Sequence, residues 1–171
     1  MKVHLVTGGA RSGKSSFVLQ EIERLYPEGQ VVFIATSQVI DEELSLRVEK
    51  HRLERGPRYL TIEEPVALDQ ALAEACTHQP VAIIIDCLTV WMGNLFYHEK
   101  NLDQAVQTLL AALQKPGPPV LIVTNEVGLG IVPDNAMARS YRDALGRVNQ
   151  HIASTADRVS LLVCGLPVVV K

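Results

Sequence analysis

The chain has 171 residues, 47% of them hydrophobic and 20% charged, which is the composition of a folded globular domain and excludes an intrinsically disordered chain. Its length fits one domain spanning residues 1–171. The formal net charge of −3 argues against nucleic acid as the main partner, because neutralising a phosphate backbone needs a basic face.

Apolar runs alternate with amphipathic segments along the first third of the chain. Residues 3–6 predict a buried strand, residues 15–26 a helix, and residues 31–35 a second buried strand. Residues 41–55 predict a strongly charged helix. Acidic residues open it, where the helix dipole favours them, and a Gly-Pro pair follows it.

The alternation continues in the middle of the chain. Residues 59–62 predict a short strand, followed by an amphipathic helix around Leu72. Residues 81–86 predict the clearest strand of the sequence, and a second amphipathic helix around Leu109 precedes a turn at residues 116–119.

The last part of the chain has one long helix between strands. Residues 120–124 predict a strand, residues 125–133 a loop with two glycines, and residues 134–157 the longest helix. Two strands, at residues 159–164 and 168–170, close the chain. Because their connection is too short for a crossover helix, the last strand should run antiparallel to its neighbour.

A phosphate-binding loop follows the first strand. Its sequence is Gly8-Gly9-Ala10-Arg11-Ser12-Gly13-Lys14-Ser15, which satisfies the P-loop pattern between a strand and a helix. In this pattern glycines let backbone amides turn toward phosphate oxygens, the lysine reaches the β- and γ-phosphates, and the serine hydroxyl ligates Mg²⁺. We predict a catalytic role for Lys14 and a metal-ligand role for Ser15. A glycine-rich turn without a ligand is the alternative.

Strands and helices in this order, with a P-loop, predict the fold class. Continuous apolar strands alternating with helices form a mostly parallel sheet that is covered on both faces. We expect an α/β P-loop NTPase (RecA-like) three-layer sandwich, with a mostly parallel sheet and an antiparallel C-terminal edge strand.

Asp86 ends the apolar strand at residues 81–86, as the carboxylate of a Walker B motif does. We predict that Asp86 is linked to the metal; capping of the next helix is the alternative. Ligands bind at the carboxyl ends of parallel strands, and polar residues follow several of the predicted strands. We expect them around one site: Thr7, Ala35-Thr36-Ser37, Asp86 and Thr124-Asn125-Glu126.

The predicted helix at residues 41–55 carries Arg47, His51 and Arg55 in one row, four residues apart. Such a row of cations is a candidate phosphate-binding face. Neighbouring positive charge disfavours the imidazolium form, so that His51 stays neutral and able to attack phosphorus. A solvated histidine in a charged helix is the alternative that spacing alone leaves open.

Other features bear on the compartment. Apolar runs of about six residues are far shorter than the roughly 20 needed to span a bilayer, and Met1–Leu5 leaves no room for a signal peptide. Cys76, Cys87 and Cys164 are odd in number and widely spaced, which favours buried free thiols over a disulfide or a metal site. We expect a cytoplasmic protein without a membrane span.

Several segments together resemble one enzyme family. They are Thr7 to Ser15, Ile34-Ala-Thr-Ser37, Arg47-x3-His51-Arg52, Thr124-Asn-Glu-Val-Gly128 with Gly130-Ile-Val-Pro133, and Gly146-Arg-Val-Asn149. Over essentially the whole chain, the sequence resembles the bifunctional adenosylcobinamide kinase/adenosylcobinamide-phosphate guanylyltransferases of cobalamin biosynthesis. The P-loop is shared by very many proteins, whereas the segments Thr124-Asn-Glu-Val-Gly128 and Gly146-Arg-Val-Asn149 are far more specific.

The resemblance implies two reactions. ATP or GTP phosphorylates adenosylcobinamide, and GTP then donates GMP to adenosylcobinamide phosphate through a histidine-bound intermediate that falls on His51. It implies Mg²⁺, held by Ser15 and Asp86, and a homotrimer. The implied nucleotide contacts are Gly8, Gly9, Ala10, Arg11, Ser12, Gly13, Lys14, Ser15, Ala35, Thr36, Ser37, Arg52, Leu53, Glu54, Arg55, Glu63 and Asp86.

Two alternatives to this function stay open at the level of sequence. One is a small-molecule P-loop kinase without nucleotidyl transfer. The other is a nucleotide-dependent switch or motor module resembling the RecA-type ATPases, for which the sequence offers no partner-binding extension. Trp91 and Phe96 could stack on a ligand, but we expect them to pack in the core.

Overall fold

The computed structural model describes residues 2–37 and 56–171. In this part of the chain, seven strands form one sheet in the order β3-β2-β4-β5-β1-β6-β7. Their bounds are β1 Val3–Gly8, β2 Val31–Ala35, β3 Tyr59–Glu63, β4 Ala82–Asp86, β5 Val120–Val123, β6 Arg158–Val163 and β7 Leu166–Val169. The strands pair in parallel except for β7, which runs antiparallel to β6 at the sheet edge, as predicted.

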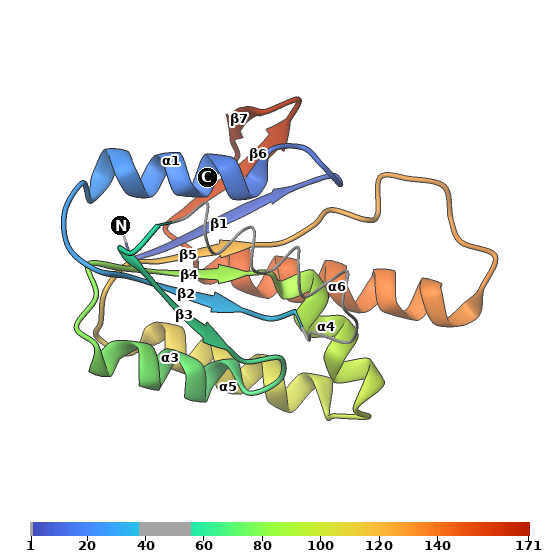
Figure 1. Cartoon of the computed structure of the whole chain (residues 1–171). Coiled ribbons are helices and arrows are strands. Elements are labelled where there is room, and N and C mark those ends of the chain that lie inside the picture. The colour runs from blue at the N-terminus through green and yellow to red at the C-terminus, as the bar shows by residue number, and fades with distance from the viewer. Residues whose placement is uncertain (1, 38–55) are drawn as a thin grey trace.

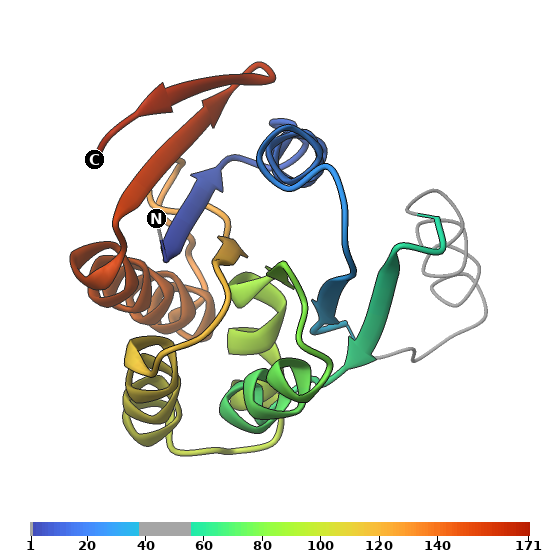
Figure 2. The same cartoon turned by 90° about the vertical axis from the view of Figure 1, so that its left-hand side faces the viewer.

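Helices cover both faces of this sheet, so the predicted three-layer α/β architecture is confirmed (Figure 1). Helix α1 (Lys14–Leu25) packs on one face, where Val18 and Ile22 bury against the strands. Helices α3 (Leu68–Thr77), α4 (Leu88–Tyr97), α5 (Leu102–Gln114) and α6 (Ala136–Thr155) cover the other. Figure 2 shows α1 as the one helix of the described residues on its side of the strands, opposite α3, α5 and α6.

Helix α4 is the one described element that the sequence did not predict. It buries Leu88, Trp91, Met92 and Leu95 and still exposes the apolar Tyr97, so it has little of the polar–apolar contrast that marks a surface helix. Trp91 is fully buried and its indole N–H donates to a backbone carbonyl, which confirms the predicted core packing of this residue.

The predicted burial of the cysteines is wrong at two positions. All three thiols are free, but Cys76 and Cys164 are exposed, because each lies near the end of an element that reaches the surface. Cys87 alone is half-buried. The predicted helix at residues 41–55 lies outside the described residues. Across residues 2–37 and 56–171, we find no helix of the length and apolarity that a membrane crossing requires.

A fully buried histidine lies beneath α1. His4 on β1 forms a 2.9 Å hydrogen bond with the Ser160 hydroxyl on β6, and its ring lies edge-on to Phe17. Arg158 and the mostly buried Glu21 face it and pair with each other at 3.2 Å. Burial, and then the positive charge of Arg158, lower the pKa of His4 from 6.5 to about 4.

This buried histidine predicts acid lability. Between pH 6.5 and pH 4 the unfolded state binds a proton at His4 that the folded state excludes, so the free energy of unfolding falls as the pH falls. The loss from this residue should reach about 3 kcal/mol by pH 4. Urea unfolding at pH 7 and pH 4 measures it, and His4→Gln should lose correspondingly less. Equal losses in both proteins would assign the acid sensitivity to other groups, of which Glu21 is the first candidate because its pKa is lowered by Arg24.

Candidate functional site

The P-loop is held in shape by two glycines. Gly8 has φ +155°, and a Cβ there would lie 2.6 Å from the Leu162 carbonyl oxygen, which is backbone and cannot move aside. Gly13 has φ +92°, and its Cβ would lie 3.1 Å from the Cα of Gly165 in the β6–β7 turn. The Gly165 amide in turn donates to the Ser12 carbonyl at 3.0 Å. The loop therefore packs directly against β6 and the turn that follows it.

Lys14 lies inside this loop with only 8% of its surface exposed. Its ammonium donates to the Gly9 carbonyl at 2.7 Å and approaches the Ser12 hydroxyl at 3.5 Å. Burial lowers the pKa of Lys14. An ammonium held by neutral acceptors in a half-closed loop can exchange them for anionic phosphate oxygens, which satisfy its charge better.

Ser15 and Asp86 meet across the site. The Ser15 hydroxyl donates to a carboxylate oxygen of Asp86 at 2.8 Å, although 71 positions separate the two residues in the chain. Asp86 ends β4, and the N-cap of the following helix α4 is Cys87, so Asp86 is not the capping residue. One hydroxyl and one carboxylate oxygen side by side suit Mg²⁺, which usually takes few protein ligands and completes its shell with phosphate oxygens and water.

The end of β2 braces the end of β4. Thr36 is fully buried, and its hydroxyl both donates to the Cys87 carbonyl at 2.9 Å and accepts from the Cys87 amide at 2.8 Å. The Asn94 amide group donates to the Thr36 carbonyl at 2.7 Å. The side chain of Thr36 is thus fully used by the backbone of Cys87, just after Asp86. The neighbouring Ala35 is buried and Ser37 is half-buried.

Glu63 also lies at the carboxyl end of a parallel strand, but away from the P-loop. It is exposed at the end of β3, in register with Ala35 of β2, which is in register with Asp86. Neighbouring strands are about 4.8 Å apart, so the four-strand step from β3 to β1 covers roughly 19 Å. The other expected site residues, His51, Arg52, Leu53, Glu54 and Arg55, lie outside the described residues.

Two of the distinctive sequence segments meet at the end of β5. The Thr124 hydroxyl donates to the side-chain oxygen of Asn149 on α6 at 2.8 Å, and the Asn149 side-chain nitrogen donates to the Asn125 carbonyl at 3.1 Å. The Asn125 amide donates to the Thr89 hydroxyl at 2.7 Å. Asn149 therefore fixes the backbone that leaves β5.

Glu126 has a structural role in this arrangement. Its amide donates to the Gly8 carbonyl at 3.1 Å, which ties the loop after β5 to the P-loop. Its carboxylate accepts from the amides of Gly128 at 2.6 Å and Leu129 at 3.0 Å. The expected gathering of strand ends around the P-loop thus holds for β4 and β5, with Glu126 turned back onto its own loop.

Thr89 and Tyr141 are the linking residues that the sequence analysis missed. The Tyr141 hydroxyl on α6 donates to the Thr89 carbonyl at 2.6 Å, and burial raises the pKa of Tyr141 to about 12. Both were missed because helix α4 was not predicted, so nothing placed its first turn next to Asp86. A threonine two residues after the Asp86-Cys87 pair was the available signal.

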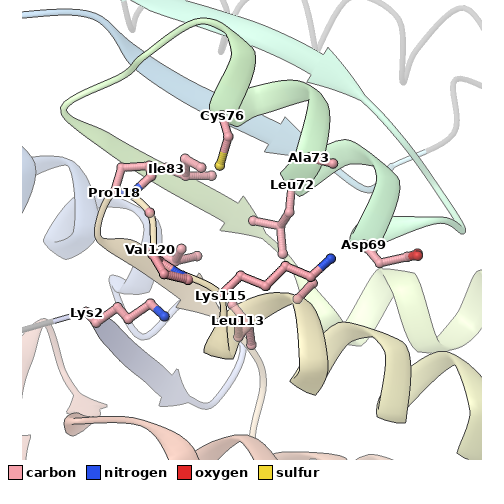
Figure 3. Close-up of a pocket in the computed structure, with 13 residues that line it drawn as sticks. Lys2, Asp69, Leu72, Ala73, Cys76, Ile83, Leu113, Lys115, Pro118 and Val120 are labelled. Atoms are coloured by element: carbon pink, nitrogen blue, oxygen red, sulfur yellow. The ribbon is translucent and has the colours of Figure 1, made fainter.

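A separate cavity of about 190 Å³ lies between α3 and α5, near the amino ends of the parallel strands (Figure 3). Leu72, Ile83 and Val120 line it, and the Lys2 and Lys115 side chains lie along it. Ile83 and Val120 are near the starts of their strands, whereas the P-loop follows the end of β1. This cavity is therefore distinct from the phosphate site.

Comparisons with known proteins place these features in a wider context. Residues 4–170 match the family model described as cobinamide kinase / cobinamide phosphate guanyltransferase. The chain is 39% identical to a bifunctional adenosylcobalamin biosynthesis protein of Escherichia coli and 40% identical to that of Salmonella typhimurium, over 98% of each chain in both cases. A protein of the same description from Pseudomonas aeruginosa is 39% identical over 98% of this chain and 96% of its own.

Similar solved structures include two archaeal proteins. The flagellar accessory protein FlaH of Methanocaldococcus jannaschii aligns with a TM-score of 0.57 and 15% identity, covering 99% of this chain and 78% of its own. A KaiC-like protein of Pyrococcus horikoshii aligns with a TM-score of 0.54 and 15% identity, covering 94% and 70%. At this identity the likeness extends to the fold alone.

Proposed function

The chain belongs to the cobinamide kinase / cobinamide phosphate guanyltransferase family, and from this premise we propose that it carries out both reactions. In the first, ATP or GTP phosphorylates the aminopropanol hydroxyl of adenosylcobinamide. In the second, GTP donates GMP to adenosylcobinamide phosphate, giving adenosylcobinamide-GDP and pyrophosphate. The observation that carries the proposal is the P-loop with Lys14 enclosed and Ser15 in contact with Asp86, within a chain that matches this family almost end to end.

In the kinase step, Lys14 would exchange its bonds to the loop for the β- and γ-phosphate oxygens. The substrate hydroxyl attacks the γ-phosphorus and loses its proton to solvent, the bond from that phosphorus to the bridging oxygen breaks, and the nucleoside diphosphate leaves. The backbone amides of the loop and the N-terminus of α1 stabilise the developing negative charge. Ser15 and Asp86 would hold Mg²⁺, which supplies neutralisation of phosphate charge.

In the guanylyl step, a ring nitrogen of His51 attacks the α-phosphorus of GTP, and the bond to the β-phosphate bridging oxygen breaks to release pyrophosphate. Arg52 or Arg55 steadies the departing pyrophosphate. A phosphate oxygen of adenosylcobinamide phosphate then attacks the same phosphorus and frees the histidine. The cationic row Arg47, His51 and Arg55 in the sequence supports this assignment.

We further infer that the protein is a cytoplasmic homotrimer. The family resemblance carries this expectation. An exposed apolar edge supports self-association: all four residues of β7 are exposed, among them Leu166, Val168 and Val169.

The position of the label in the product tests the proposed function. Purified protein is incubated with Mg²⁺, adenosylcobinamide and GTP carrying radiolabel on either the α- or the γ-phosphate. We expect γ-label in adenosylcobinamide phosphate and α-label in adenosylcobinamide-GDP. Transfer of γ-label without α-label would leave a small-molecule kinase that lacks nucleotidyl transfer. Nucleotide hydrolysis without transfer of either label would contradict both assignments.

A further inference from the structure

An apolar groove of about 840 Å³ lies between α4, the loop after β5 and the start of α6. Phe96 and Tyr97 line it from α4, Val127 from the loop, and Met137 and Tyr141 from α6. Tyr97 is 81% exposed and Met137 72% exposed, so large apolar side chains face solvent here. Exposed apolar surface of this kind marks binding sites, and the volume lies within the roughly 300–1,000 Å³ of ligand pockets.

Hydrogen bonds connect this groove to the phosphate site. Tyr141 in its lining donates to the carbonyl of Thr89, in the first turn of α4, which directly follows β4 and its terminal carboxylate. On the loop side, Val127 follows Glu126, whose amide donates to the Gly8 carbonyl of the P-loop. The groove therefore lies beside the phosphate site. Figure 1 shows α4 and part of α6 at the end of the sheet to which the parallel strands point.

Hydrogen bonds hold the loop that lines the groove at both of its ends. The Arg139 guanidinium donates to the carbonyls of Pro133 at 2.9 Å and Asp134 at 2.6 Å, which fixes the end of the loop to α6. At the start of the loop, the Glu126 carboxylate holds the Gly128 amide. A loop secured at both ends loses little further freedom on binding, which favours affinity.

We propose that this groove binds the corrin ring of adenosylcobinamide, an inference that rests on the proposed function. The reacting hydroxyl is at the end of a short arm, so the macrocycle must lie close to the phosphate site. The faces of a corrin ring are broad and apolar and its edge carries amide side chains. Tyr97 and Met137 offer flat and deformable apolar surface for a ring face. Asn135 and Arg142 in the lining offer hydrogen-bonding groups for amides.

A second copy of this chain is the competing occupant. Stable protein interfaces bury about 800 Å² on each partner and tend to involve extended surfaces. A concave groove that adjoins a reaction centre suits a ligand better, because small-molecule sites are concave, mostly apolar and supplied with a few polar groups.

Corrinoid binding measured without turnover tests the inference. The probe is adenosylcobinamide itself, followed in the dark by equilibrium dialysis, where its visible colour reports the free and bound fractions. The variants are Tyr97→Ala, Met137→Ala and the double variant. The matched control is His78→Ala, which truncates an exposed side chain at the C-cap of α3, outside the groove lining. Each protein is also scored for covalent labelling by α-labelled GTP, which needs no corrinoid.

We expect the double variant to bind adenosylcobinamide about tenfold more weakly or worse, with GTP labelling unchanged and the His78→Ala control like wild type. Unchanged corrinoid affinity in the double variant would overturn the inference. If sedimentation also showed that this variant forms a smaller assembly than the wild-type protein, the groove would be assigned as an interface between copies. Should one variant lose GTP labelling through misfolding, the other single variant decides. Wild-type protein that binds the corrinoid at this groove without transferring phosphate would refute the proposed function and leave the groove assignment standing.

Discussion

Replacing His51 with alanine should abolish covalent guanylylation of the protein. Wild-type protein incubated with Mg²⁺ and α-labelled GTP, then denatured, should carry label that is acid-labile and stable to alkali, as a phosphoramidate is. In His51→Ala this label should fall by a factor on the order of 10³ or more, because no other group takes over as nucleophile. Transfer of γ-label to adenosylcobinamide should persist, since the P-loop residues that handle the γ-phosphate are intact.

His78→Ala is the matched control for this experiment. His78 is exposed at the C-cap of α3, on an element that contributes nothing to the phosphate site. The control should label like wild type. Acid-labile label that survives in His51→Ala would show that another residue carries the GMP, and the cationic row of residues 41–55 would then lose its assigned role.

The sequence predicted the scaffold well because strands in a two-sided sheet are continuous apolar runs. The strand prediction at residues 31–35 coincides with β2. The short connection expected between the last two strands, at residues 165–167, predicted the antiparallel pairing of β6 and β7, which two residues join in the structure. Helix α4 was missed because its exposed side is also apolar. Val90 and Tyr97 face solvent, so the polar–apolar contrast along the helix is weak even though its buried residues recur at helical spacing.

The site was predicted in its phosphate-binding half. The P-loop pattern determines its own geometry, so the roles expected for Lys14, Ser15 and Asp86 correspond to groups that the fold brings together. The use of Thr36 could not be read from the sequence, because its hydroxyl serves the backbone of another strand. The same holds for Asn149, whose partners lie 24 and 25 positions away.

The P-loop and the apolar groove meet different physical requirements. Phosphoryl transfer needs charge stabilisation at fixed positions, and the P-loop is accordingly rigid, with Gly8 confined by the backbone of β6. Recognition of the acceptor needs apolar area, which the groove between α4 and α6 provides. Tyr141 belongs to both, since it lines the groove and bonds the turn after Asp86. Changes to the groove should therefore affect acceptor binding before they affect the chemistry on the nucleotide.

Replacing Lys14 with alanine should reduce phosphoryl transfer by a factor on the order of 10² to 10³, because it removes a preorganised positive charge from a site where the transition state gains negative charge. This ammonium is mostly buried and bonded to the Gly9 carbonyl, and a water that fills the space left by the truncated side chain carries no charge to replace it. Lys14→Arg should restore little, since a planar guanidinium fork does not fit the space of a compact ammonium. Lys115→Ala, at the C-cap of α5, is the control that should transfer phosphate like wild type.

The same variant decides how many triphosphate sites the protein uses. We expect Lys14 also to stabilise the triphosphate that His51 attacks, so Lys14→Ala should lower covalent labelling by α-labelled GTP by a factor on the order of 10². Loss of both activities means one site that serves the two reactions in turn. Full labelling without phosphoryl transfer would contradict the shared site. A second nucleotide site would then have to be sought toward Glu63, which ends β3, four strands from β1 in the sheet.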